Sequence, residues 1–289
     1  MRVTVFPAVA EFLATVRPVL AEHEAEHHLV LGVAEASAAS PVPRATPFAA
    51  VIEDDDGLVL AAWMEESHPL LLTSDRGSEL SAARAVVDAL RDRELTPSHV
   101  IGMVDLVEAF VGVWTERTGG PARLTMRQRA YKLDVVQPLP PVPGHLRAAT
   151  PDDADLVASW QHAFDVEALG ALALPSDSWR TGRRIAAGEI HLWCDGDAHP
   201  RAMAGSARAT AHGVAVNAVY TPPEWRGRGY ATACVAELSR RLLGSGFSFC
   251  VLYTDLGNRT SNAIYTRIGY RPVCDFLMYD LRIQASSSP

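Results

Sequence analysis

The stretch that most constrains this chain runs from Val214 to Thr232 and has the sequence VAVNAVYTPPEWRGRGYAT. Its first part, through Tyr220, is mostly apolar and rich in valine, which predicts a buried strand. Proline has no amide hydrogen to donate to a sheet ladder, so Pro222 and Pro223 end that strand. A turn with two glycines follows, and behind it an apolar helical pattern. The stretch therefore predicts a strand, a glycine-bearing turn and a helix in immediate succession.

This turn has the features of a phosphate-binding site. Backbone amides at a helix N-terminus point at a ligand there, and the helix dipole favours negative charge. Gly227 and Gly229 let a ligand approach the backbone closely, while Arg226 and Arg228 add positive charge at the rim. A single pair of glycines is weak evidence, because loops often carry one for turn geometry alone.

The spacing R-x-x-G-x-A, from Arg226 to Ala231, resembles the acetyl-CoA signature of the GNAT superfamily of N-acetyltransferases. It differs from the dinucleotide pattern G-x-G-x-x-G and from a P-loop. The resemblance implies that the amides of the turn hold the pyrophosphate of coenzyme A, and that the end of the preceding strand aligns the acetyl and cysteamine part. The residues assigned to acetyl-CoA in this way are Val219, Tyr220, Thr221, Arg226, Gly227, Arg228, Gly229, Tyr230, Ala231 and Thr232.

A second motif follows one strand later and resembles the GNAT pattern N-x-x-S/A-x-x-x-Y-x-x-x-G-F/Y. The resemblance implies that Asn258 contacts the pantetheine arm and that Ser261 and Asn262 lie near the coenzyme at a helix N-terminus. It also implies that Tyr265 points its hydroxyl at the thioester sulfur. Alone, Asn258 and Ser261 could be turn and cap residues, and Tyr265 a core tyrosine. Their position one strand after the glycine turn favours the functional interpretation.

At 289 residues the chain has the size of two ordinary domains, and the order of predicted elements repeats. Each half has a helical region, a hairpin with an acid-glycine turn, and then strand, turn, helix, strand, helix and strand. The first helical pattern runs from Val9 to about Ala36. We predict an α/β (α+β) chain of two tandem GNAT-like domains, each a twisted mixed sheet flanked by helices. The domains are placed at 1–136 and 145–289, joined by a proline-rich linker at 137–144.

The two copies differ at the turn where a coenzyme would bind. In the first half this turn is Thr73–Ser78, which has one glycine and an acid that would repel pyrophosphate. We therefore predict that the first domain has no coenzyme site. We expect it to cover the sheet of the second domain and to shape the acceptor pocket.

Acetyl transfer to an amine sets the roles to be filled. The amine must lose a proton before it attacks the thioester, and the departing thiolate leaves faster if a donor such as Tyr265 hydrogen-bonds it. Positioning of the two substrates supplies much of the rest, so neither a metal nor a covalent enzyme intermediate is required. The central strand carries Asn217 and no carboxylate. The candidates for the base are residues near the motifs: Glu224, Asp255, Glu189 and His212.

Three functions fit this pattern. The first is an acetyl-CoA-dependent N-acetyltransferase that acts on a primary amine of a small molecule or peptide. The second is a noncatalytic acetyl-CoA-binding regulatory or partner-binding protein, which the missing strand carboxylate keeps open. The third is a tandem transferase with an unusual acceptor, such as a sugar-linked cysteine or an aminoacyl compound, as some two-copy GNAT members have.

Composition excludes other classes. The net charge of −8 argues against nonspecific nucleic-acid binding, which relies on clustered Lys and Arg. No window approaches the roughly 18 apolar residues of a membrane span, and the N-terminus lacks the pattern of a signal peptide. The four cysteines lack metal-type spacing. We therefore expect a reduced, cytoplasmic protein without nucleic-acid or membrane partners.

Overall fold

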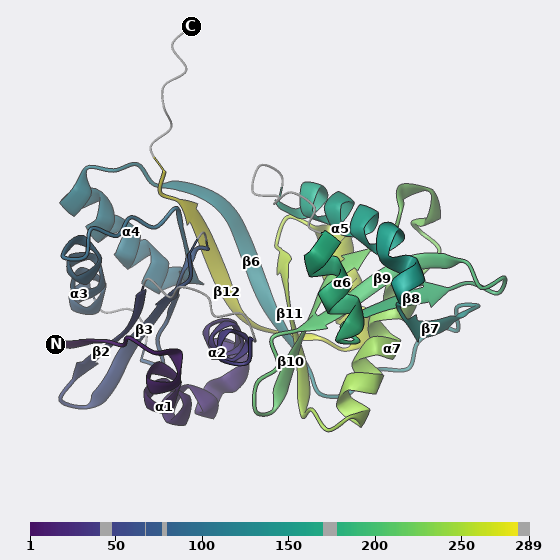
Figure 1. Ribbon diagram of the computed structural model, residues 1–289, viewed down its shortest axis with the longest axis horizontal. Helices are drawn as coiled ribbons and strands as arrows, with labels where there is room; N and C mark the ends of the chain where they lie inside the picture. Colours follow the sequence, from purple (N-terminus) through teal and green to yellow (C-terminus); the bar gives the residue numbers. More distant parts are fainter. Residues whose placement is uncertain (41–47, 67, 77–79, 170–177, 283–289) are drawn as a thin grey trace, which may run out of the picture.

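The structure is a computed structural model that describes residues 1–40, 48–66, 68–76, 80–169 and 178–282. Within these residues twelve strands form a single mixed sheet with helices on both faces (Figure 1). The strands are β1 (Arg2–Val5), β2 (Phe48–Asp54), β3 (Gly57–Met64), β4 (Leu70–Thr73), β5 (His99–Met103), β6 (Arg123–Leu133), β7 (His145–Ala148), β8 (Ile190–Cys194), β9 (Pro200–Ala207), β10 (Gly213–Tyr220), β11 (Phe249–Asp255) and β12 (Arg271–Asp280). The helices are α1 (Val9–Leu20), α2 (Glu24–Ala38), α3 (Leu80–Arg91), α4 (Val104–Thr118), α5 (Ala154–Leu169), α6 (Ser178–Ala186), α7 (Tyr230–Gly244) and α8 (Arg259–Ile268).

The repeated order of elements predicted from the sequence is confirmed, and so is the mixed α/β fold. The long first helix was predicted wrongly, because a 3₁₀ turn at Ala21–His23 divides it into α1 and α2. Two short strands, β1 and β7, were not predicted. Each spans four residues, too few to show a period, and each forms only by pairing with a neighbouring strand. Part of the turn Thr73–Ser78 lies outside the described residues.

The two halves exchange their last strands. The sheet order is β1-β2-β3-β4-β5-β12-β6-β11-β10-β9-β8-β7, so β12 joins the first half and β6 joins the second. β6 is antiparallel to β11, and β12 is antiparallel to both β5 and β6. Figure 1 shows β6 and β12 as the two long strands between the halves. Each half of the sheet is therefore completed by a strand from the other half, whatever boundary is drawn in the sequence at 137–144.

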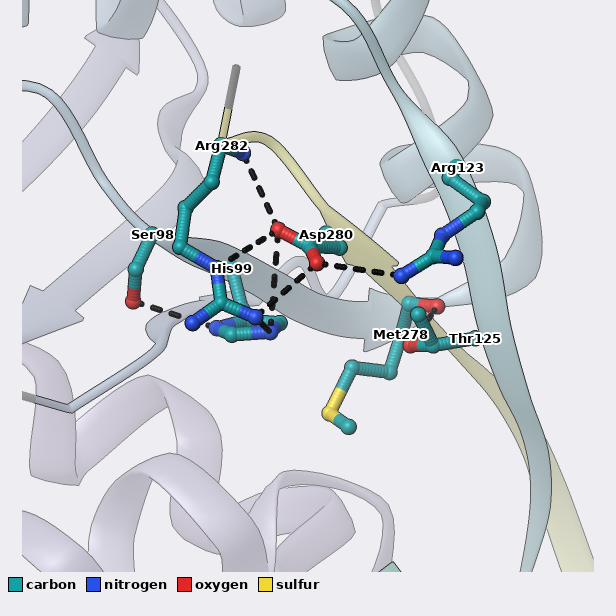
Figure 2. A network of polar contacts seen from close by, with 7 residues as sticks. All are labelled: Ser98, His99, Arg123, Thr125, Met278, Asp280 and Arg282. Carbon is teal, nitrogen blue, oxygen red and sulfur yellow. Dashed lines mark hydrogen bonds and ion pairs between the residues drawn. The ribbon is translucent and has the colours of Figure 1, made fainter. Parts of the chain in front are cut away.

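A polar network fixes the far end of β12 in the first half (Figure 2). The carboxylate of Asp280 accepts hydrogen bonds from the backbone amide and guanidinium of Arg282 and from Arg123 of β6. Its other neighbour is the buried His99 of β5, at 3.8 Å. The hydrogen bond from Arg282 is the main reason that the pKa of Asp280 lies well below its usual range. Asp280 thus ties the exchanged strand to both neighbours.

Both faces of the sheet are covered in each half. In the first half α1 and α2 pack on one face, through residues such as Phe12, and α3 and α4 on the other, through residues such as Phe110. In the second half α7 and α8 cover one face, while α5 and α6 cover the other. Helix α2 also reaches the second half, where Ala25 packs on Phe249 and Val251 (Figure 1).

The proline-rich segment 137–144 is packed along the second half. Its Leu139 and Val142 lie partly buried against the core beside α7 and α8. The indole nitrogen of Trp193 donates a hydrogen bond to the carbonyl of Pro143 at 3.3 Å. The segment therefore has a defined path from β6 to β7. None of the helices within the described residues combines the length and apolar character needed to cross a bilayer.

Candidate functional site

The parallel strands β10 and β11 pair only at their starts. The register runs from Gly213↔Phe249 to Ala215↔Val251 and goes no further within the described residues. Beyond it, β10 is held by β9 and β11 is held by β6. A register shift after Asn217 and a positive φ of 50° at Ala218 mark a bulge, which bends β10. We call the segments Val216–Tyr220 and Leu252–Asp255 the splay. Their facing main-chain groups are not used to pair the two strands with each other.

The glycine turn follows the end of β10. Gly227 and Gly229 have φ values of 77° and 83°, in the left-handed region that favours glycine. Helix α7 begins at Tyr230 with no side chain capping it, and its first bond runs from the Ala233 amide to the Gly229 carbonyl at 3.0 Å. The amides of residues 230–232 therefore have no acceptor within the helix. Together with the helix dipole, these amides are suited to hold an anionic group.

The two arginines of the turn have different surroundings. Arg226 donates from Nε to the Thr221 carbonyl at 2.8 Å and from Nη2 to the carboxylate of Glu167 on α5, also at 2.8 Å. Arg226 thus holds the turn against the end of β10 and against α5. Arg228 is exposed and lies over the ring of Trp225, 4.7 Å from its centroid. It is the arginine of the turn whose charge has no carboxylate partner among the described residues.

The last two residues of β10, Val219 and Tyr220, and the Thr221 that follows them lie beside this turn. Val219 packs toward α7, and Tyr220 packs on Trp160 of α5 with ring centroids 6.2 Å apart. The hydroxyl of Thr221 is buried and has no hydrogen-bond partner among the described residues. A buried hydroxyl without a partner is unfavourable unless a ligand or water satisfies it. Thr221 therefore offers a further polar contact next to the turn.

The second motif forms the start of α8. Asn258 caps this helix, because its side-chain oxygen accepts a hydrogen bond from the Ser261 amide at 3.0 Å. The side-chain amide of Asn262 donates to the carbonyls of Asp255 and Asn258, at 2.9 and 2.7 Å. Its oxygen accepts from the hydroxyl of Tyr131 at 2.7 Å. Asn262 is therefore held between β11 and Tyr131, which belongs to the exchanged strand β6 and was missed in the sequence.

Tyr265 lies one helical turn after Ser261 and is buried against Tyr270, with ring centroids 6.0 Å apart. Burial raises the pKa of Tyr265 to about 12, and a hydrogen bond with the Ser261 side chain offsets part of this increase. The hydroxyl is therefore protonated at neutral pH and can donate a hydrogen bond.

The base candidates are dispersed. His212 lies at the start of β10, where its Nδ1 is 2.6 Å from the carboxylate of Glu24. Glu189 accepts from Arg184 at 3.0 Å. Glu224 and Asp255 are exposed, near the turn and at the end of β11. The structure therefore does not bring these four groups together.

A network under α5 and α6 occupies the position where the strand lacks a carboxylate. Arg184 donates to the side-chain oxygen of Asn217 at 2.9 Å and to that of Gln161 at 3.3 Å. Gln161 in turn donates to Asp165 at 3.0 Å. Burial raises the pKa of Asp165, and the hydrogen bond from Gln161 offsets part of the increase. Asp165 was not singled out in the sequence, because only its burial distinguishes it from other helix carboxylates.

Comparison with known proteins agrees with this geometry. The model of the FR47-like protein family matches residues 196–276, which include both motifs: the glycine turn and the pattern that begins at Asn258. A GCN5-related N-acetyltransferase from Sphaerobacter thermophilus has a similar structure, with a TM-score of 0.62 at 18% identity over 96% of this chain and 94% of that one. A Drosophila protein has a TM-score of 0.65 at 12% identity over 96% and 97% of the two chains.

A tandem GNAT protein of the clavulanic acid biosynthesis pathway, in its structure without acetyl-CoA, has a TM-score of 0.54 at 13% identity. The similarity covers 96% of this chain and 98% of that one. No curated protein matches this chain. The resemblance drawn from the sequence is confirmed: this chain has the tandem GNAT fold, and its second half carries the FR47-like sequence.

Proposed function

We propose that this protein is an acetyl-CoA-dependent N-acetyltransferase that works through its second half. The observation that carries this proposal is the juxtaposition of the splay with the glycine turn. The splay supplies free main-chain groups between two parallel strands, and the glycine turn supplies three helix amides without an acceptor in the helix. The unpartnered hydroxyl of Thr221 adds to this fit. The acceptor is a primary amine of a small molecule or peptide.

Bound acetyl-CoA supplies the activated acetyl thioester. In the proposed mechanism the turn amides hold the pyrophosphate, and the main chain of the splay orients the arm that carries the acetyl group. The Tyr265 hydroxyl donates to the sulfur as the thiolate leaves. Because the pKa of Tyr265 is about 12 and that of a thiol about 8.5, full proton transfer would cost about 5 kcal/mol. Tyr265 therefore stabilises the thiolate as a hydrogen-bond donor.

The amine must lose a proton before it attacks. We assign this proton to Asp165, because hydrogen bonds through Gln161 and Arg184 link it to Asn217 of the splay. Burial also raises the pKa of Asp165, which favours it as a base over an ordinary surface carboxylate. The Asp165→Asn variant should lower kcat by about 10²-fold, the lower end of the usual range for general-base loss. The measurement is the pH profile of kcat. A variant that keeps the wild-type profile contradicts this assignment.

The alternative is a noncatalytic acetyl-CoA-binding protein. The feature that favours it is Asn217, which stands in place of a strand carboxylate and is already engaged by Arg184. We further propose a cytoplasmic setting, which the four free thiols support. In this setting neither a nucleic acid nor a membrane is a partner.

Calorimetric titration with acetyl-CoA, and then with coenzyme A, tests the proposal. We expect one site per chain, followed by release of free thiol when amines are added to the loaded enzyme. Two sites per chain would mean that the first half also binds coenzyme. Binding without turnover on any amine would support the noncatalytic alternative, and no binding at all would overturn both.

A further inference from the structure

The face of the splay opposite α7 carries polar groups that coenzyme binding does not use. Side chains alternate along a strand. Cys250 and Leu252 of β11 pack toward α7, whereas Val251 and Tyr253 lie on the other face, beneath α2. On β10, Asn217 lies on this same face, where it contacts Arg184 of α6. An acceptor that approaches the splay from this side meets residues of α2, α6 and Tyr253.

Arg208 lies on this face, directly after β9. Its guanidinium carbon is 5.8 Å from the centroid of the Tyr253 ring. Its backbone has a φ of 52°, a left-handed conformation that is strained for a non-glycine residue. Helix α2 packs on its backbone at Gly32, where a Cβ would lie 2.9 Å from both the Cβ and the carbonyl oxygen of Arg208. The first half thus holds a strained arginine over the second half's splay.

The polar groups of this pair are not satisfied within the protein. The Nε of Arg208 and the hydroxyl of Tyr253 are buried, and neither has a hydrogen-bond partner in the part of the chain that the structure describes. Burial lowers the pKa of Arg208, and only the interaction with Tyr253 opposes this effect. The Arg208 side chain as a whole is half-buried, but a buried Nε and a buried hydroxyl without partners are unfavourable, so a bound anion that pairs with them would remove a cost already present in the fold.

The neighbouring Arg184 shows the contrast. It is equally on this face, but it is satisfied by Glu189, Gln161 and Asn217. Burial lowers its pKa, and the positive charges of Arg180 and Arg208 contribute to this decrease. Arg184 thus has partners within the protein, whereas the Nε of Arg208 has none among the described residues.

The coenzyme is not the anion that Arg208 lacks. Ala207, the residue before Arg208, pairs with Ala215 near the start of β10, whereas the glycine turn follows the strand's end. The length of β10 from the level of Arg208 to the strand's end at Tyr220 is about six residues. At about 3.3 Å per residue, Arg208 is therefore roughly 20 Å from the turn. Tyr253 is two residues beyond the last pair of β10 with β11, at the level of the splay. The pair therefore faces the place where an acceptor, rather than the pyrophosphate, would lie.

We propose that the guanidinium of Arg208 and the hydroxyl of Tyr253 bind an anionic oxygen group of the acceptor, which is thus an amine that also carries a carboxylate or phosphate. The inference rests on the proposed function, because it names the substrate class of the same site. A guanidinium offers a planar fork of donors that matches either group, and the tyrosine adds one more. The first half contributes to acceptor choice through α2, which holds Arg208 in place.

The experiment compares matched amines in the thiol-release assay: common amino acids, the amides of the same amino acids, and aminomethylphosphonate. We expect kcat/KM to be about 10- to 100-fold higher for an anionic amine than for its neutral amide, the range for charged hydrogen bonds. Arg208→Gln should remove this preference by raising KM for the anionic amine. Arg208→Lys should restore part of it. Comparing kcat/KM for aminomethylphosphonate and for the amino acids shows whether the site prefers a phosphate-like group or a carboxylate.

Two controls separate this role from a structural one. The Kd for acetyl-CoA should be unchanged in Arg208→Gln, and its Tm without ligand should be equal or higher, because the variant removes a guanidinium nitrogen that is buried without a partner among the described residues. A lower Tm with equal losses for anionic and neutral amines would mean that Arg208 is structural and would overturn the inference. Arg228→Gln, which changes an exposed arginine on the turn, should leave the preference intact.

Binding separates this inference from the proposed function. The same amines are titrated into protein saturated with coenzyme A, and the Tm shift is recorded for wild type and Arg208→Gln. If no amine is acetylated but anionic amines bind in an Arg208-dependent way, the transferase fails and the anion site stands. If amides are acetylated as well as the acids, or no anionic amine binds to wild type, the anion site is overturned.

Discussion

The central parallel strands of the two halves begin alike and end differently. In the first half β4 and β5 pair from Leu70↔Val100 to Leu72↔Gly102, and each strand then ends within one residue. The two strands are still in close contact at their last pair, because a Cβ on Gly102 would lie only 2.7 Å from the Leu72 carbonyl oxygen. In the second half β10 and β11 also form three pairs, but both strands continue without pairing to each other. Only the second half therefore has a splay.

The turns after these strands differ in the same sense. In the first half the Thr73 hydroxyl lies 2.7 Å from Nδ1 of His27, and Asp75 lies 3.3 Å from its Nε2. The Ser74 hydroxyl donates to the Val59 carbonyl at 2.6 Å. The side chains of Thr73, Ser74 and Asp75 thus have partners within the protein, whereas the Thr221 hydroxyl before the second turn has none among the described residues. Under the proposed function, one copy of the fold supports the other by lending α2 and β6, and the other receives the ligand.

The Gly229→Glu variant should have the largest effect, because it places a side chain and a negative charge among the turn amides. The position has a φ of 83°, and even a Cβ would lie 3.1 Å from Val142. We expect coenzyme affinity to fall about 100-fold or more, as charge repulsion and lost amide contacts combine. Calorimetry measures this loss.

The matched control is Gly227→Ala, where a Cβ would meet nothing within 4 Å and only the left-handed backbone is strained. Its loss should be far smaller, about fivefold, corresponding to roughly 1 kcal/mol of strain. Normal coenzyme affinity in Gly229→Glu would contradict the difference proposed between the two turns, because the second turn would then be no more a ligand site than the first.

Tyr265→Phe should have the next largest effect, on turnover rather than on binding. The variant removes one hydrogen-bond donor from the proposed leaving group, so kcat should fall by about 10- to 100-fold. The Kd for acetyl-CoA should change less than about threefold, since the ring keeps its packing on Tyr270. Single-turnover kinetics and calorimetry give the two quantities. Equal losses in both would show that the hydroxyl is structural, as in an ordinary core tyrosine.

Local patterns predicted much of the second half. The strand to Tyr220, the glycine turn, α7 and α8 follow from residues adjacent in the chain, and each element is found where the pattern indicated. The cap at Asn258 is also a local feature, since a side chain and an amide three residues apart form it. Patterns of this range are set by backbone preferences, which the sequence carries directly.

The exchange of β6 and β12 could not be predicted in the same way. An apolar strand pattern shows that a strand is covered, but it does not say which strand is its neighbour. The same limit hid Tyr131 and Arg208, whose contacts join segments far apart in the chain. Neither residue lies in a motif. Tyr131 lies in a strand with many polar and charged residues, RLTMRQRAYKL, so its residue type does not distinguish it there.

Asp280→Asn tests how firmly the exchanged β12 is held in the first half. The side chain is 7% exposed and accepts hydrogen bonds from Arg282 and Arg123. We expect a loss of about 2 kcal/mol in the free energy of unfolding at pH 7, as for charged hydrogen bonds. Because the folded pKa of Asp280 is depressed, its contribution is present above the unfolded value of about 3.9 and is lost as pH falls further. Urea denaturation at several pH values measures both effects.

The matched control on the same strand is Asp275→Asn. This carboxylate pairs with Arg129 of β6 at 2.6 Å, but both side chains are about one-third exposed. An exposed pair of this kind contributes less than about 1 kcal/mol. An equal loss from both variants would show that the end of β12 is no more firmly fixed than its middle.

Tyr131→Phe should have the smallest effect and bears most directly on whether the halves are independent. The hydroxyl of this first-half tyrosine donates to Asn262 at 2.7 Å, and its loss leaves a part-buried acceptor without that partner. We expect about 1 kcal/mol of weaker coenzyme binding, close to a fivefold increase in Kd, with no change in the one-site stoichiometry. Tyr279→Phe is the control, since no hydrogen bond from that hydroxyl exists among the described residues. If Tyr131→Phe binds coenzyme as wild type does, β6 serves only as the edge that holds β11. A selective loss would mean that the first half, for which we predict no coenzyme site, helps to orient the second half's site.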